Sequence, residues 1–122
     1  MSKVLKQDMQ LLQQICQTIF DKSGFNILTL DVRELSLMTD YYVIAEGNVE
    51  KHVQAIAKAI IQELKALQCH SEGLRIGDWV VSDFGNVVVH LFIPEMREKY
   101  ALEQLWQQAK IIDVPIVTTS LR

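Results

Sequence analysis

Three aspartates stand at the ends of β-prone runs and have the side chains that hard metal ions prefer. Asp31, Asp40 and Asp83 could in principle gather around a divalent cation. No DxD or ExxH spacing, however, places two of them on one face of one element. We therefore expect solvated carboxylates at strand ends, and neither a metal nor another cofactor.

The histidines and cysteines do not follow a pattern typical of nucleophilic or redox catalysis. His52, His70 and His90 fall in separate predicted elements, and no serine or cysteine has a nucleophile-elbow sequence around it. Cys16 and Cys69 lack CxxC spacing, which predicts two reduced structural thiols. The residues do not indicate an enzyme, although spacing alone leaves a triad open.

Gly47 lies between a predicted strand and a predicted helix, where free N–H groups can bind a phosphate. The chain contains neither GxGxxG nor GxxxxGK[ST], and Glu46 and Glu50 beside the turn would repel an anion. A nucleotidyltransferase-like enzyme is therefore only an alternative hypothesis.

The stretch from Gly77 to Pro94 indicates a different kind of site. Two β-prone runs are joined by Gly85-Asn86, which predicts a two-residue hairpin. Side chains alternate between the faces of a strand, so one face is almost entirely apolar and includes Phe84. The other face, here called the mixed face, carries Trp79, Val81, Asp83, Val88, His90 and Phe92. We expect it to bind a macromolecular partner; the alternative is that helices cover both faces and enclose an Asp83–His90 pair.

The elements around the hairpin follow from periodicity and turn residues. We expect one helix over 5–20 and a second from an Asn48 N-cap to Leu67. A third helix should begin at Pro94, with a packing side made of Met96, Tyr100, Leu105 and Trp106. Between the helices we expect a central strand over 26–32, a turn with a short helical piece over 33–40, a strand over 41–46 and a short extended piece within 69–77. This order predicts one α/β domain over 1–110, with a mixed sheet flanked by helices. Residues 111–122 form a tail of uncertain structure, either an edge strand or a loose segment.

Composition restricts the class of partner. The 15 acidic and 12 basic residues give a net charge of -3, which provides no cationic field for DNA or RNA. A mildly acidic protein can still bind a basic protein by complementary charge. No signal sequence, transit peptide or membrane-spanning apolar run is evident, so we expect a cytoplasmic protein without a membrane partner.

A wider set of residues forms a family pattern: Leu30-Asp31-Val32, Leu37 to Ala45 with Gly47, Glu72-Gly73, Gly77, Trp79, Asp83, Gly85, Val88, His90, Phe92, Arg97, Tyr100, Leu102-Glu103 and Leu105-Trp106. In this pattern, which runs from about Leu5 to Ala109, the chain resembles the ribosomal silencing factors, also called the Iojap-related family. Glu46 stands where the family commonly has a small residue, and Ser82 where it usually has an aliphatic one. The resemblance leaves the tail unexplained.

The resemblance implies a nucleotidyltransferase-like fold without the acidic pair that holds the metal in those enzymes. It implies a non-enzymatic factor that binds the large ribosomal subunit through the fourteenth protein of the large-subunit series. There it would block joining of the small subunit and lower translation when nutrients are short. It also implies a homodimer when free, and organellar relatives suggest large-subunit assembly as an alternative role. The expected partner-binding residues are those of the mixed face, with Arg97 and Tyr100 beside the same sheet edge.

Overall fold

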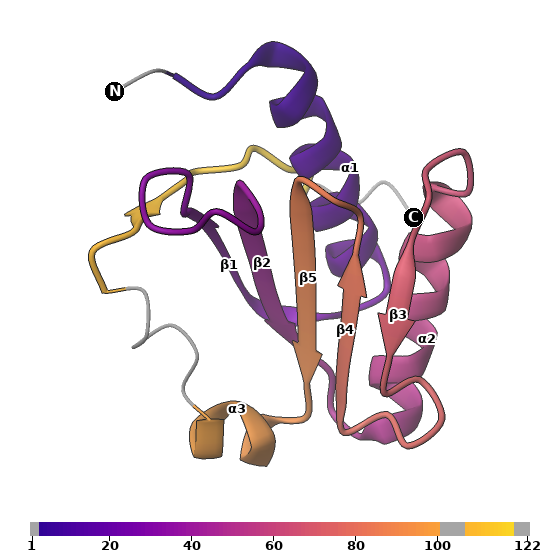
Figure 1. Cartoon of the computed structure of the whole chain (residues 1–122). Helices are drawn as coiled ribbons and strands as arrows, with labels where there is room; N and C mark the ends of the chain where they lie inside the picture. Colours follow the sequence, from indigo (N-terminus) through magenta and orange to yellow (C-terminus); the bar gives the residue numbers. More distant parts are fainter. Residues whose placement is uncertain (1–2, 101–106, 119–122) are drawn as a thin grey trace.

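The computed structural model describes residues 3–100 and 107–118 as one mixed sheet flanked by helices (Figure 1). The elements in chain order are α1 (Lys6–Asp21), β1 (Phe25–Asp31), β2 (Tyr41–Glu46), α2 (Glu50–Glu63), β3 (His70–Glu72), β4 (Trp79–Asp83), β5 (Val87–Phe92), α3 (Pro94–Tyr100) and β6 (Lys110–Ile111). The sheet order is β3-β4-β5-β2-β1-β6, and β2 runs parallel to β5 while the other neighbours are antiparallel. The predicted fold class is confirmed. The expected packing residues Leu105 and Trp106 lie outside the described residues.

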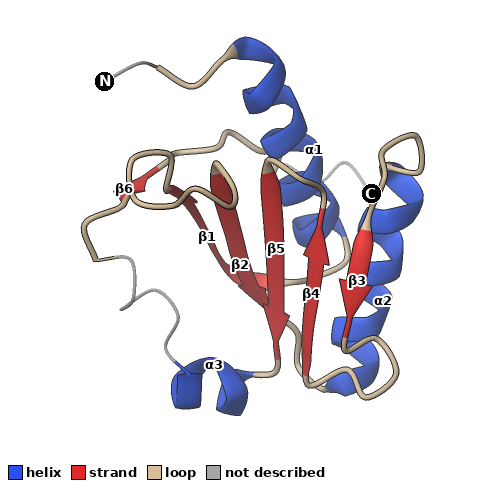
Figure 2. Ribbon diagram, in the orientation of Figure 1, coloured by secondary structure: helices blue, strands red, loops and turns tan. Residues whose placement is uncertain are grey.

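Helices α1 and α2 pack on the same face of the sheet (Figure 2). Both are amphipathic, so each can bury one apolar stripe against the strands. Their buried side chains are Leu12, Ile15, Cys16 and Ile19 from α1, and Val53, Ile56, Ala57 and Ile60 from α2. Against them pack the inward side chains of the central strands, together with Phe84, which is only 8% exposed. This layer is the main hydrophobic core.

The β4–β5 hairpin has the predicted register. Trp79 pairs with Phe92 and Asp83 with Val88, so the mixed face forms as expected. The Phe84 N–H donates to the Val87 carbonyl at 2.9 Å, which closes the turn. Gly85, the first of the two central turn residues, takes a φ of +95°. The primed turns that favour two-residue hairpins require a positive φ at this position, and glycine adopts it without strain.

Four expectations about flanking elements are wrong. Residues 33–40 form turns and bends, without the expected short helical piece. Strand β1 is not central, because β2 and β5 occupy the middle and only the short β6 lies beyond β1. Val49, not Asn48, holds the N-cap position of α2, while the Asn48 N–H donates to His52 Nδ1 at 2.9 Å. The helix ends at Glu63, so Leu67 is not on its buried stripe and is 44% exposed.

The C-terminal segment is attached to the domain as far as residue 118. After β6 pairs with β1, residues 112–118 run along α1, where Ile112, Val114 and Ile116 pack against the main core. The Gln17 side chain accepts the Val117 N–H at 2.7 Å and donates to its carbonyl at 3.0 Å. Of the two alternatives for the tail, residues 110–111 form an edge strand. Residues 112–118, here called the strap, have no regular secondary structure but pack against the core.

Candidate partner-binding face

The mixed face is only partly covered. Helix α3 packs at the end of β5 where Phe92 lies, and Phe92 is fully buried there with Met96 against it. Towards the β4–β5 turn, at the opposite end of the sheet, no helix of the described residues covers this face (Figure 1). Trp79, Val81, Val88 and His90 are half-buried, and Asp83 is exposed. The structure therefore leaves an apolar surface open beside a carboxylate.

Aromatic rings form a continuous row across this face. Trp79 lies at the centre, with ring centroids 5.0 Å from Phe92 and 4.8 Å from Tyr100. His90 continues the row, 6.1 Å from Trp79 and 5.3 Å from Tyr42 on the neighbouring strand β2. Tilted and edge-on arrangements at these distances are the favourable geometries for aromatic pairs. The row holds Trp79 in a defined orientation, as an aromatic anchor requires.

His90 is a neutral acceptor within this row. The Trp79 Nε1–H donates to His90 Nδ1 at 3.1 Å, which assigns the ring proton to Nε2. Burial lowers the pKa of His90 to about 4, and the hydrogen bond acts in the same direction because protonation would remove the acceptor. Asp83 instead accepts the Gly85 N–H at 2.8 Å. The alternative of an enclosed Asp83–His90 pair is therefore wrong.

The depressed pKa of His90 predicts a specific loss of stability in acid. The unfolded chain binds a proton near pH 6.5, whereas the folded chain does so only near pH 4. Neutral His90 therefore makes its full contribution to the free energy of unfolding above about pH 6.5. The free energy of unfolding should fall by roughly 3 kcal/mol as the pH drops from there to about 4, because only the unfolded chain binds the proton in this range. Urea denaturation at stepped pH would measure it. His90→Gln, which retains an acceptor for Trp79, should lose this part of the pH slope; an unchanged slope would contradict the assignment.

An ion pair attaches α3 to the sheet. Arg97 Nη1 lies 3.1 Å from Glu46 Oε2, and the two side chains are only 11% and 9% exposed. The same guanidinium donates to the Asn26 carbonyl, and the Asn26 side chain donates to Glu46 at 3.2 Å. Arg97 therefore positions α3, and with it Tyr100 over Trp79. Arg97 was predicted to bind a partner, but at 11% exposure its side chain has little free surface.

The other candidates for chemistry have structural partners. Asp31 forms a bidentate pair with Arg33, which lowers the pKa of Asp31 mainly through their hydrogen bonds. His52 bridges the Asn48 N–H and the Lys22 carbonyl, and exposed His70 lies 3.3 Å from Glu72. Within residues 3–100 and 107–118, no three His, Cys, Asp or Glu side chains are grouped as metal ligands.

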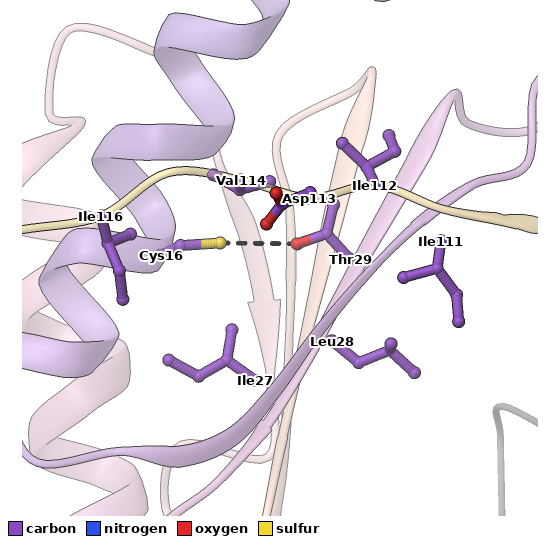
Figure 3. A pocket seen from close by; sticks show the side chains of 9 residues that line it. All are labelled: Cys16, Ile27, Leu28, Thr29, Ile111, Ile112, Asp113, Val114 and Ile116. Carbon is purple, nitrogen blue, oxygen red and sulfur yellow. Dashed lines mark hydrogen bonds between the residues drawn. The ribbon is translucent and has the colours of Figure 1, made fainter.

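A pocket of about 290 Å³ lies between α1, β1 and the strap (Figure 3). Its walls are mostly aliphatic, from Ile27, Leu28, Ile111, Ile112, Val114 and Ile116. Cys16 Sγ lies 3.4 Å from Thr29 Oγ1, and burial raises the pKa of the Cys16 thiol. A buried, protonated thiol is a poor nucleophile. The pocket therefore offers mainly apolar contacts and no reactive cysteine.

Sequence reasoning missed two contributions to the face. Tyr42 joins it because β2 pairs in parallel with β5, which places Tyr42 beside Val88. The sequence showed that Tyr41 and Tyr42 point to opposite faces of their strand. It did not show that this strand, β2, pairs with β5. Leu37 and Met38, in the turn before β2, are exposed to water. This turn lies next to the β4–β5 turn, to which it is hydrogen-bonded.

The fold and this face define a class of protein: a small α/β domain with a preformed aromatic surface that is partly open. The family model for the ribosomal silencing factor during starvation matches residues 6–122, so the chain belongs to that family. The match includes the tail, which the motif pattern left unexplained. The predicted family is confirmed, and it is named for silencing of ribosomes, not for a catalysed reaction.

Known proteins agree with this assignment. The chain is 37% identical to a ribosomal silencing factor of Halalkalibacterium halodurans, over 86% of this chain and 92% of the relative. It is 42% identical to the mitochondrial assembly of ribosomal large subunit protein 1 of Mus musculus, over 56% of this chain but 32% of that protein. A Chromobacterium violaceum crystal structure superposes with a TM-score of 0.78 at 28% identity, covering 91% of this chain and 92% of that one. In the part of this chain that the structure describes, no helix is long and apolar enough to cross a membrane.

Proposed function

We propose that this protein is a translational silencing factor that binds the large ribosomal subunit through its fourteenth protein and blocks joining of the small subunit. The observation that carries the proposal is the mixed face itself, on which half-buried Trp79 and exposed Asp83 lie on one sheet surface, with Asp83 at the open end. A central aromatic group with a carboxylate at the rim is the composition expected for a surface that binds a basic protein. Binding would lower translation when nutrients are limiting.

We assign the predicted site residues to two roles. Trp79, Val81, Asp83, Val88 and Tyr100 have surface available to a partner. The half-buried His90 orients Trp79, buried Phe92 packs beside Trp79, and ion-paired Arg97 attaches α3 to the sheet. We propose a cytoplasmic protein that is a homodimer when free, without DNA or membrane as a partner.

Assembly of the large subunit is the second candidate. It is favoured by the mouse relative, whose name gives it a role in assembling that subunit in mitochondria. Both roles would use the same docking face, so a binding assay alone does not separate them. Depleting the protein from growing cells would: accumulation of immature large subunits during growth supports assembly, whereas normal subunits with unrestrained joining during starvation support silencing.

A subunit-joining assay tests the proposed function. Purified large and small subunits are mixed with increasing amounts of the protein, and joined ribosomes are separated by sedimentation. We expect joining to fall while the protein comigrates with the large subunit alone. Unchanged joining at saturating protein, or equal binding to both subunits, would contradict the proposal.

Trp79→Ala should weaken binding to isolated large subunits by about 2 kcal/mol or more, the loss typical of a central aromatic anchor. Binding is measured by cosedimentation at a temperature where a melting curve shows the variant to be folded. Leu67→Ala is the matched control, because Leu67 is an exposed apolar side chain at the end of α2, away from the mixed face. Full-strength binding by folded Trp79→Ala would exclude the mixed face as the docking surface.

A further inference from the structure

The turn between β1 and β2 presents two large apolar side chains to water. Leu37 is 104% exposed and Met38 is 87% exposed, at adjacent positions. Single exposed apolar residues are common on protein surfaces and need no explanation, whereas contiguous exposed apolar surface is typical of an interaction site. We call this pair the apolar tip.

The turn that carries the apolar tip is held in a defined conformation. The Asp40 and Tyr41 N–H groups donate to the Asn86 carbonyl at 3.1 and 3.0 Å, and Thr39 Oγ1 donates to the Gly85 carbonyl at 3.1 Å. Within the turn, the Met38 N–H donates to Ser36 Oγ at 3.0 Å. A protrusion ordered in this way loses little conformational entropy on binding.

These hydrogen bonds also place the apolar tip at the open end of the mixed face. They join its turn to the β4–β5 turn, next to Asp83 and Val88, at the end of the sheet away from α3 (Figure 1). The chain then enters β2, whose Tyr42 lies beside Val88 on the mixed face. The apolar tip therefore belongs to a turn that lies next to the open end of the mixed face.

The charges around the apolar tip select the kind of partner. Arg33 is 2.7 Å from Asp31, so these two charges offset each other, and Glu34 shares the lining of a pocket with Lys110. Asp40, directly after the tip's turn, and exposed Asp83 then give this end of the face a negative character. A negative rim opposes binding to the phosphate backbone of RNA and favours a basic protein surface.

We infer that the apolar tip inserts into an apolar pocket on a basic protein of the large ribosomal subunit, as a second anchor in addition to Trp79. This inference rests on the proposed function and adds a contact to it. The two anchors lie towards opposite ends of the mixed face: Trp79 near α3, and the apolar tip near the β4–β5 turn. Asp83 lies next to that turn, on the side towards the centre of the face.

The test compares Leu37→Ser/Met38→Ser with Ile76→Ser, a control that removes a 63% exposed aliphatic side chain from the β3–β4 connection. Because the apolar tip is exposed, the double variant should melt within about 2 °C of the unsubstituted protein. It should bind isolated large subunits about 30-fold more weakly, the equivalent of an interface hot spot. The control should bind at full strength.

Several results would overturn the inference and leave the proposed function standing. One is binding by the double variant within about threefold of the unsubstituted protein while Trp79→Ala binds poorly. Another is equally tight, tip-dependent binding to ribosomal RNA stripped of protein, which would make RNA the occupant. A third is a double variant that sediments as a monomer where the unsubstituted protein is a dimer, yet binds subunits normally; the apolar tip would then bind a second copy. Failure of the unsubstituted protein to bind large subunits would instead contradict the proposed function.

Discussion

Phe84→Ala should lower the free energy of unfolding by roughly 3 to 5 kcal/mol, because it removes a large side chain from the main core and leaves a cavity. Phe84 is 8% exposed and packs in the cluster that α1 and α2 form with the sheet. A loss of this size is a large part of the stability of an ordinary domain. Chemical denaturation at neutral pH would measure it.

Val81→Ala is the matched control for Phe84→Ala. Val81 lies on the same hairpin but on the mixed face, and it is half-buried. Its truncation should cost much less, about 1 kcal/mol. Equal effects of the two substitutions would mean that the mixed face is as deeply buried as the core face, which would remove the basis for a docking surface there.

Arg97→Met should lower the free energy of unfolding by about 3 kcal/mol, because it leaves the Glu46 carboxylate enclosed without its counter-charge. The pair is almost covered, at 11% and 9% exposure, and Arg97 also donates to the Asn26 carbonyl. Loss of the ion pair should also release α3 and the stacking of Tyr100 on Trp79. Thermal and urea denaturation would measure the stability.

A double variant shows whether the ion pair is the cause. Arg97→Met combined with Glu46→Ala removes both charges. Most of the lost stability should return, because the main cost of the single change is the unpaired charge. If the two losses simply add, Arg97 acts through its packing and its bond to Asn26, and Glu46 is not its essential partner.

The sequence alone determined part of the local structure of this protein, above all the β4–β5 hairpin and α1. Alternation of apolar residues around Gly85-Asn86 was sufficient for the hairpin register, because a two-residue turn defines which side chains face each other. The spacing of apolar residues in 5–20 likewise predicted α1. The absence of ligand spacing argued against a metal site, and the family pattern gave the class of protein.

Tertiary structure decided everything that depends on pairing between distant segments. Parallel pairing of β2 with β5 brought Tyr42 to the mixed face, and packing of α3 buried Phe92 and paired Arg97 with Glu46. A sequence shows which face of a strand is apolar, but not which helix covers it or how far. Long-range packing also determined that Trp79 binds His90, because a hydrogen bond between two strands depends on side-chain orientation in the assembled sheet.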